Sequence, residues 1–132
     1  MKSRDTMVQL VRFKTEEKRK KVADLEMMIR DFEGMAVDLD RQIEAEHERT
    51  GVRDENHFSY STFAKAAAQR RANLRASVED LKRRLDAARD ELMNAQMDLK
   101  RAEQIEDRDT GRRRVEPAGF GSQQAARATD RA

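Results

Sequence analysis

The sequence predicts an all-α protein: a long antiparallel two-helix coiled-coil hairpin with a disordered C-terminal tail. Three observations predict it. Two long segments carry an apolar 3-4 repeat, turn-forming residues separate them, and blocks of opposite charge meet when the chain folds back. Of the 132 residues, 41% are charged and none is Trp or Cys, so apolar residues are too few for a globular core. We therefore expect one domain.

The first apolar repeat runs from Val8 to Glu46 and predicts a helix over about residues 4–49. Gly34 lies off the repeat, where a glycine weakens a helix by about 1 kcal/mol without changing the register. The a positions of this repeat are Val8, Thr15, Val22, Ile29, Ala36 and Ile43. The d positions are Val11, Lys18, Leu25, Phe32, Leu39 and Glu46.

The repeat stops between Arg49 and Tyr60, and we expect a turn over about residues 50–59. The stretch 50–56 contains Thr, Gly, Asp and Asn, which are turn formers. A serine at position 59 or 61 can cap the helix that follows, because its hydroxyl accepts a hydrogen bond from a free backbone N–H group.

The second repeat predicts a helix over about residues 60–109, which ends the hairpin domain 1–110. Gly111 is a plausible stop, and residues 111–132, rich in Gly, Ala, Ser and Gln, are expected to form the disordered tail. The a positions are Ala64, Arg71, Val78, Leu85, Leu92 and Leu99. The d positions are Tyr60, Ala67, Leu74, Leu81, Ala88, Ala95 and Ala102.

Charge favours the hairpin over a parallel dimer. Residues 1–21 carry a net charge of +5, residues 24–55 carry −7, residues 65–89 carry +5 and residues 90–109 carry −4. Folding back near residue 55 places 24–55 against 65–89 and 1–21 against 90–109, so both contacts join opposite signs. A parallel homodimer would place each block beside its own copy, and flanking charges set the orientation of coiled coils.

The sequence offers no catalytic constellation, and we expect a non-enzymatic protein with no cofactor and no metal. The two histidines, His47 and His57, are ten residues apart across a turn and have no Cys to complete a metal site. Polar helix-end residues are the better interpretation. No signal peptide and no apolar run of about 18 residues is apparent, so a cytoplasmic location is expected.

One alternative is a structural or DNA-binding dimeric coiled coil. The run from Arg12 to Lys21 is rich in Lys and Arg and leads into the repeat, as in a basic-region zipper. Glu16 and Glu17 interrupt this run, and the formal net charge of +2 is too small to indicate nucleic-acid binding.

Three of the six aromatic residues gather at the expected turn. The candidate partner-binding residues are His57, Phe58, Tyr60 and Phe63. They either close the end of the helix pair or anchor a partner, because exposed aromatic side chains are costly in water. We favour the anchor for Phe58 and closure for Phe63, which precedes the a-position Ala64. Tyr60 can turn its ring inward and leave its hydroxyl in water.

Several stretches resemble the FliJ family, the coiled-coil components of the bacterial flagellar type III export apparatus, and in particular its alphaproteobacterial branch. They are the opening 1–6 with Arg12-Phe13, the triplet 17–19, the tip His57-Phe58-Ser59-Tyr60-Ser61-Thr62-Phe63-Ala64-Lys65-Ala66-Ala67, and the triplet 69–71. The resemblance covers roughly residues 1–110, and its tip motif is more specific than the repeats. Family members commonly have Pro where this chain has Ser61.

The resemblance implies a stalk-like hairpin that links the hexameric export ATPase to the cytoplasmic domain of the export gate and helps to recycle export chaperones. It implies a cytoplasmic protein held at the inner face of the inner membrane only through its partners, at the flagellar base. No nucleic acid is expected among these partners.

Overall fold

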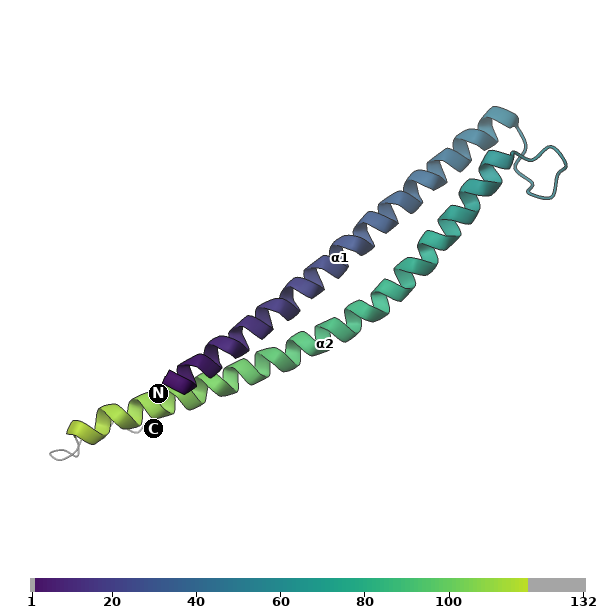
Figure 1. The fold of residues 1–132 in the computed structure, drawn as a ribbon. Helices are drawn as coiled ribbons and strands as arrows, with labels where there is room; N and C mark the ends of the chain where they lie inside the picture. Colours follow the sequence, from purple (N-terminus) through teal and green to yellow (C-terminus); the bar gives the residue numbers. More distant parts are fainter. Residues whose placement is uncertain (1, 119–132) are drawn as a thin grey trace. The chain divides into compact units, whose positions relative to one another are not determined.

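The structure is a computed structural model that describes residues 2–118, without the side chains of residues 2, 4 and 112–118. Two helices make up the fold: α1 spans Lys2–Thr50 and α2 spans Thr62–Ala118, with residues 51–61 connecting them (Figure 1). The all-α hairpin predicted from the repeats is confirmed. Neither described helix contains a stretch long and apolar enough to cross a lipid bilayer.

Helix α2 differs from the prediction at both ends. It begins at Thr62 rather than near residue 60, and it continues through Gly111 to Ala118. The expected stop at Gly111 is wrong because this glycine lacks the positive φ of a helix-ending residue; among the described residues only Gly51 has one. Residues 111–118 therefore belong to α2, and the rest of the predicted tail, 119–132, lies outside the described residues.

The chain divides into two compact units, and each contains a segment of both helices. The tip unit comprises residues 20–89, and the terminal unit comprises, among the described residues, 2–19 and 90–118. Within each unit the α1 segment packs antiparallel to the α2 segment. Every a and d position predicted from the repeats is buried or half-buried, so the predicted register is confirmed over both helices.

The core of the tip unit consists of two apolar clusters. One joins Leu25 and Ile29 of α1 to four α2 residues, namely Val78, Leu81, Leu85 and Ala88. The other joins Leu39 and Ile43 to Ala64 and Ala67, which are fully buried. Alanine at these positions lets the two backbones approach closely, so the helix pair is tightly packed next to the connecting loop.

The seam of the terminal unit is more polar. Val8 is buried, but the next a position is Thr15, which is fully buried. The Thr15 hydroxyl lies 2.8 Å from the Val11 carbonyl oxygen of its own helix and 3.3 Å from the Ala95 carbonyl oxygen of α2. This contact satisfies the hydroxyl, as a buried polar group requires.

Ion pairs between the helices have the signs that the charge blocks predicted. In the tip unit, Glu26 pairs with Arg89 at 3.1 Å and Glu33 with Lys82 at 3.8 Å. In the same unit, Asp40 forms ion pairs with both Arg71 and Arg75. In the terminal unit, the pairs are Arg12 with Glu103 and Lys18 with Glu91. The fold-back pairing of the charge blocks is thus confirmed within each unit.

Candidate functional site

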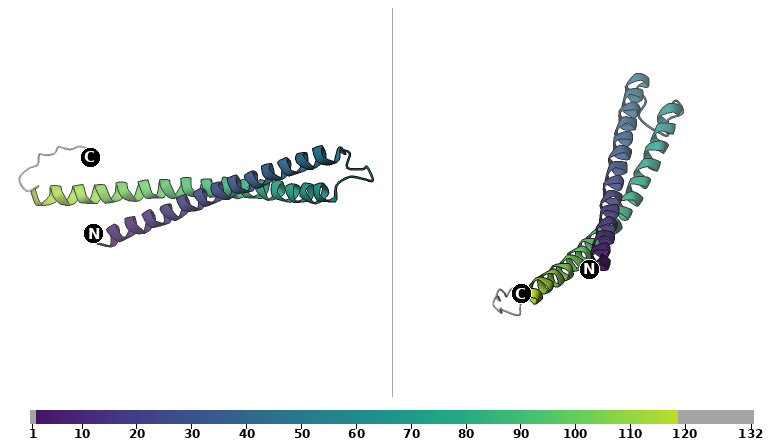
Figure 2. Two further views of the ribbon diagram at one scale, coloured as in Figure 1. Left: turned by 90° about the horizontal axis from the view of Figure 1, so that it is seen from above. Right: turned by 60° about the vertical axis from the view of Figure 1, so that its left-hand side comes forward.

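The candidate site is the tip segment, residues 46–63, which includes the last turn of α1, the loop 51–61 and the first residues of α2. The loop projects beyond the adjoining helix ends (Figure 1 and the left view of Figure 2). Helix α1 ends at Thr50, and the next residue is Gly51, whose φ of 76° suits a residue without a side chain. The Gly51 N–H donates to the His47 carbonyl at 2.8 Å, which closes the last turn of the helix.

Local hydrogen bonds hold the loop itself. The Asn56 N–H donates to the Asp54 side chain at 2.9 Å, and the His57 N–H donates to the Asp54 carbonyl at 3.0 Å. Arg53 reaches back to α1 and donates to both carboxylate oxygens of Glu44, at 2.9 and 2.8 Å. These bonds from Arg53 lower the pKa of Glu44. A two-bond Arg–carboxylate contact fixes orientation, so the loop is tethered to the helix that precedes it.

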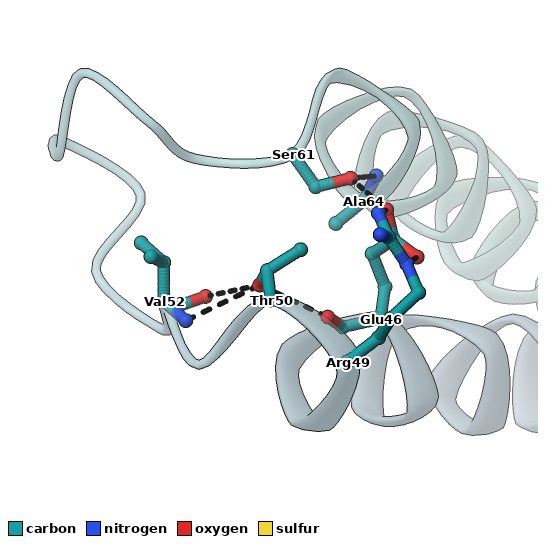
Figure 3. Close-up of polar contacts among 6 residues, drawn as sticks. All are labelled: Glu46, Arg49, Thr50, Val52, Ser61 and Ala64. Atoms are coloured by element: carbon teal, nitrogen blue, oxygen red, sulfur yellow. Dashed lines mark hydrogen bonds and ion pairs between the residues drawn. The ribbon is translucent and has the colours of Figure 1, made fainter.

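Ser61 caps α2. Its hydroxyl oxygen accepts a hydrogen bond from the Ala64 N–H at 3.1 Å, which is the N-cap geometry. The same hydroxyl donates to a Glu46 carboxylate oxygen at 2.5 Å, so the cap is also bonded to the last turn of α1 (Figure 3). Of the two serines that the sequence offered, Ser61 is the cap. Ser59 instead donates its backbone N–H to His57 Nδ1 at 2.9 Å.

Glu46 is the central polar residue of the tip. Arg49 donates to both of its carboxylate oxygens, at 2.9 and 2.6 Å, and Ser61 adds the third bond (Figure 3). The hydrogen bonds from Arg49, and next that from Ser61, lower the pKa of Glu46 to about 2. The carboxylate is therefore ionised at neutral pH and joins the end of one helix to the start of the other.

His57 and Phe58 form the exposed part of the tip. The Phe58 side chain is 94% exposed, and its ring stacks on the His57 ring with centroids 4.7 Å apart and planes at 22°. Phe58 therefore contributes nothing to closing the core. The two stacked rings are exposed in the same loop as the exposed acidic residues Asp54 and Glu55.

The roles expected for Tyr60 and Phe63 differ in part from what the structure shows. The Tyr60 ring packs against the core cluster of Leu39 and Ile43, as predicted, but its hydroxyl is not left to water. It shares a 2.7 Å hydrogen bond with His47 Nε2. Phe63 does not fold over the seam: it remains 49% exposed and lies outside that cluster. Closure is thus the role of Tyr60, because Phe63, one residue before the buried a position, faces the flank of the seam.

Two residues of this site, Glu46 and His47, were not predicted from the sequence as site residues. Glu46 was predicted only as a d position, and His47 only as a polar helix-end residue. One feature of the sequence could have indicated the role of Glu46: it places a carboxylate at a seam position opposite the N-cap of the second helix. A serine there can bond both the helix N-terminus and the carboxylate, which makes a polar residue acceptable at the seam.

The tip and the rest of the described chain show no clustering of metal ligands. Within residues 2–118, no group of three or more His, Cys, Asp or Glu side chains is placed to hold a metal ion. The basic run near the N-terminus is partly engaged: Arg12 and Lys18 pair with carboxylates of α2, and Arg19 pairs with Glu16 at 3.2 Å. Each of these three cations thus pairs with a carboxylate of the terminal unit.

Comparison of the chain with protein-family models, with curated proteins and with solved structures gives no match in any of the three. The tip geometry and the residues themselves therefore carry the functional argument.

Proposed function

We propose that this chain is a non-enzymatic component of a bacterial flagellar type III export apparatus. Its hairpin would act as a stalk between the export ATPase ring and the cytoplasmic domain of the export gate, and would aid the delivery of chaperones and substrates. It would work in the cytoplasm, at the inner face of the inner membrane, held there only by its partners.

The tip segment carries the proposal. Residues 57–67 are where the resemblance to the FliJ family is most specific, and they cover the end of the connecting loop and the first turns of α2. Within them, Phe58 is 94% exposed next to a loop tethered through Arg53. A fixed loop loses little conformational entropy on binding, so an exposed ring on such a loop suits an anchor in a partner pocket.

The rest of the fold supports a role in interaction. The described residues form two helices and one loop, and each seam is filled by side chains of the chain itself. A helix pair of this kind needs few residues to expose surface along both of its helices. Export machinery needs a component that contacts several proteins along one molecule, and a hairpin with distinct tip and terminal units has that property.

The test is binding to purified partners. The tagged chain is incubated with the export ATPase and, separately, with the cytoplasmic domain of the export gate from the same bacterium. Binding to at least one of them is expected, and strains that lack the chain should assemble few flagella. Failure of the folded chain to bind either protein, together with normal flagella in the deletion strain, would overturn the proposal.

A further inference from the structure

The two sides of the helix pair in the tip unit differ in chemistry. On one side lie the e positions of both repeats, and ion pairs cross the seam there: Glu26–Arg89, Glu33–Lys82 and Asp40–Arg75. On the other side lie the g positions. Between residues 28–42 of α1 and 63–77 of α2, all of which are described, no ion pair bridges the helices on this g side.

The g side carries exposed apolar side chains that the e side lacks. Met28 and Met35 of α1 and Phe63 of α2 occupy g positions and are 43%, 50% and 49% exposed. Between the helices on this side runs a groove of about 570 Å³. Phe32, Met35, Leu39 and Leu74 form its apolar wall. Three of these also touch the core, so the groove opens directly onto the seam.

The charged residues that line the groove have opposite signs on its two rims. Asp38 lies on the α1 rim and Arg70 lies on the α2 rim. Asp38 makes only an exposed 3.5 Å contact with Arg41 of its own helix, and Arg70 takes part in no ion pair of the tip unit. Both side chains are therefore open to a charged group of a partner that enters the groove.

We propose that this groove binds an amphipathic α-helix of a partner protein, with a basic edge along α1 and an acidic edge along α2. A third helix fits because ridges of side chains pack into the groove between two helices. An extended strand does not fit, because the helices offer no edge to satisfy its backbone groups. Methionines suit such a surface because their flexible thioether chains adapt to the incoming side chains.

The length of the site follows from the α1 residues that line the groove. From Phe32 to Gln42 they cover 10 residue steps, or about 15 Å at 1.5 Å per residue. A partner segment of about three helical turns would therefore cover it. The inference does not depend on the proposed function, because it stands on the groove and its two rims alone.

The experiment uses the full chain and two synthetic helical peptides of 21 residues with the same composition. Both have Leu at i, i+3, i+4 and i+7 spacing. One has Lys along the edge that faces α1 and Glu along the other, and the second has these edges exchanged. Binding is measured by isothermal titration calorimetry. The first peptide should bind, and exchange of the edges should weaken binding by about tenfold or more.

Variants of the chain test the location. Met35→Glu should weaken binding of the first peptide by about tenfold or more. Met27→Glu is the matched control, since Met27 is 50% exposed, as Met35 is, but lies outside the groove, and it should bind as the parent does. The double variant Asp38→Lys, Arg70→Glu should prefer the exchanged peptide. Circular dichroism melting verifies that each variant is folded.

Three results would overturn the inference. Equal binding of both peptides would show that the rims do not select charge. Equal loss in Met27→Glu and Met35→Glu would place the contact elsewhere. Self-association of the chain that Met35→Glu abolishes, without peptide binding, would show that a second copy covers the groove instead.

Discussion

Glu46 shows how one side chain can couple the two helices. It accepts hydrogen bonds from Arg49 on its own helix and from Ser61 across the loop. Ser61 in turn caps α2 through the Ala64 N–H. A change at Glu46 therefore reaches the N-terminus of α2, although Glu46 belongs to α1.

The first prediction follows from the lowered pKa of Glu46. In the folded chain the pKa of Glu46 is about 2, below its ordinary value of 4.5, so the carboxylate stabilises the fold at higher pH. This stabilisation is fully present above about pH 4.5 and is lost as the pH falls towards about 2. Glu46→Gln should therefore melt at a lower temperature than the parent at pH 7, and the difference should shrink between pH 5 and about pH 2.

Thermal melting by circular dichroism across this pH range provides the measurement. Glu55→Gln is the control, because Glu55 lies exposed in the adjoining loop 51–61 and has no such set of hydrogen bonds. If the difference between Glu46→Gln and the parent stays constant down to pH 2, the carboxylate does not stabilise the tip in its ionised form.

Substitution of Gly34, unlike that of Glu46, should make the protein more stable. It lies on the exposed face of α1, and a methyl group added there would meet no atom within 4 Å. Its φ is not positive, so Gly34→Ala keeps the helical backbone and reduces the entropy of the unfolded chain. The unfolding free energy should rise by about 0.5–1 kcal/mol in urea denaturation. An unchanged or lowered stability would contradict it.

At the scale of single elements, the seam could be predicted in full from the sequence, and the tip only in part. The spacing of apolar residues fixes which face of a helix is buried, so every predicted seam position is buried or half-buried. The end of α2 was mispredicted because a glycine can either end a helix or continue it, and the choice depends on its backbone angles. The bond between Glu46 and Ser61 joins residues on either side of a loop, and periodicity carries no information about such contacts.

The seam leads to a prediction about both helices. Leu25 and Leu85 belong to the same core cluster and are 8% and 6% exposed. An aspartate at either position loses apolar contacts and places a charge in the seam, which together cost about 3–5 kcal/mol. Leu25→Asp and Leu85→Asp should both lower the melting temperature sharply. Met27→Asp is the control on the exposed face of α1, and equal melting of all three variants would refute the register.

The tip aromatic residues should separate into two classes. Phe58→Ala should leave the melting temperature unchanged, because its side chain is 94% exposed, and should weaken binding to the export ATPase or to the export gate's cytoplasmic domain. Tyr60→Phe should do the reverse: it removes the hydrogen bond to His47 and lowers stability by about 1 kcal/mol, with binding unchanged in the folded fraction. Normal binding of a folded Phe58→Ala variant to both proteins would leave the anchor interpretation without support.

At the scale of the whole molecule, the division of charge specifies how the chain pairs with itself. Each unit joins a basic segment to an acidic one, whereas a parallel dimer would join segments of like sign. The same charges leave the groove between residues 28–42 of α1 and 63–77 of α2 without an ion pair that bridges the helices, and so open to a partner. The antiparallel orientation of the two helices and the position of the proposed binding groove thus both depend on how charge is arranged along the sequence.

The last prediction tests this arrangement through salt. Each exposed ion pair contributes only about 0.2–1 kcal/mol, but the pairs within both units act in the same direction. Added salt shortens the Debye length from about 30 Å at 0.01 M to about 8 Å at 0.15 M and screens the attraction. The melting temperature of the full chain should therefore fall over this range, while sedimentation shows a monomer throughout. A melting temperature that rises steadily from the lowest salt concentration, or a tight dimer at micromolar concentration, would mean that the opposed charge blocks do not orient the two helices.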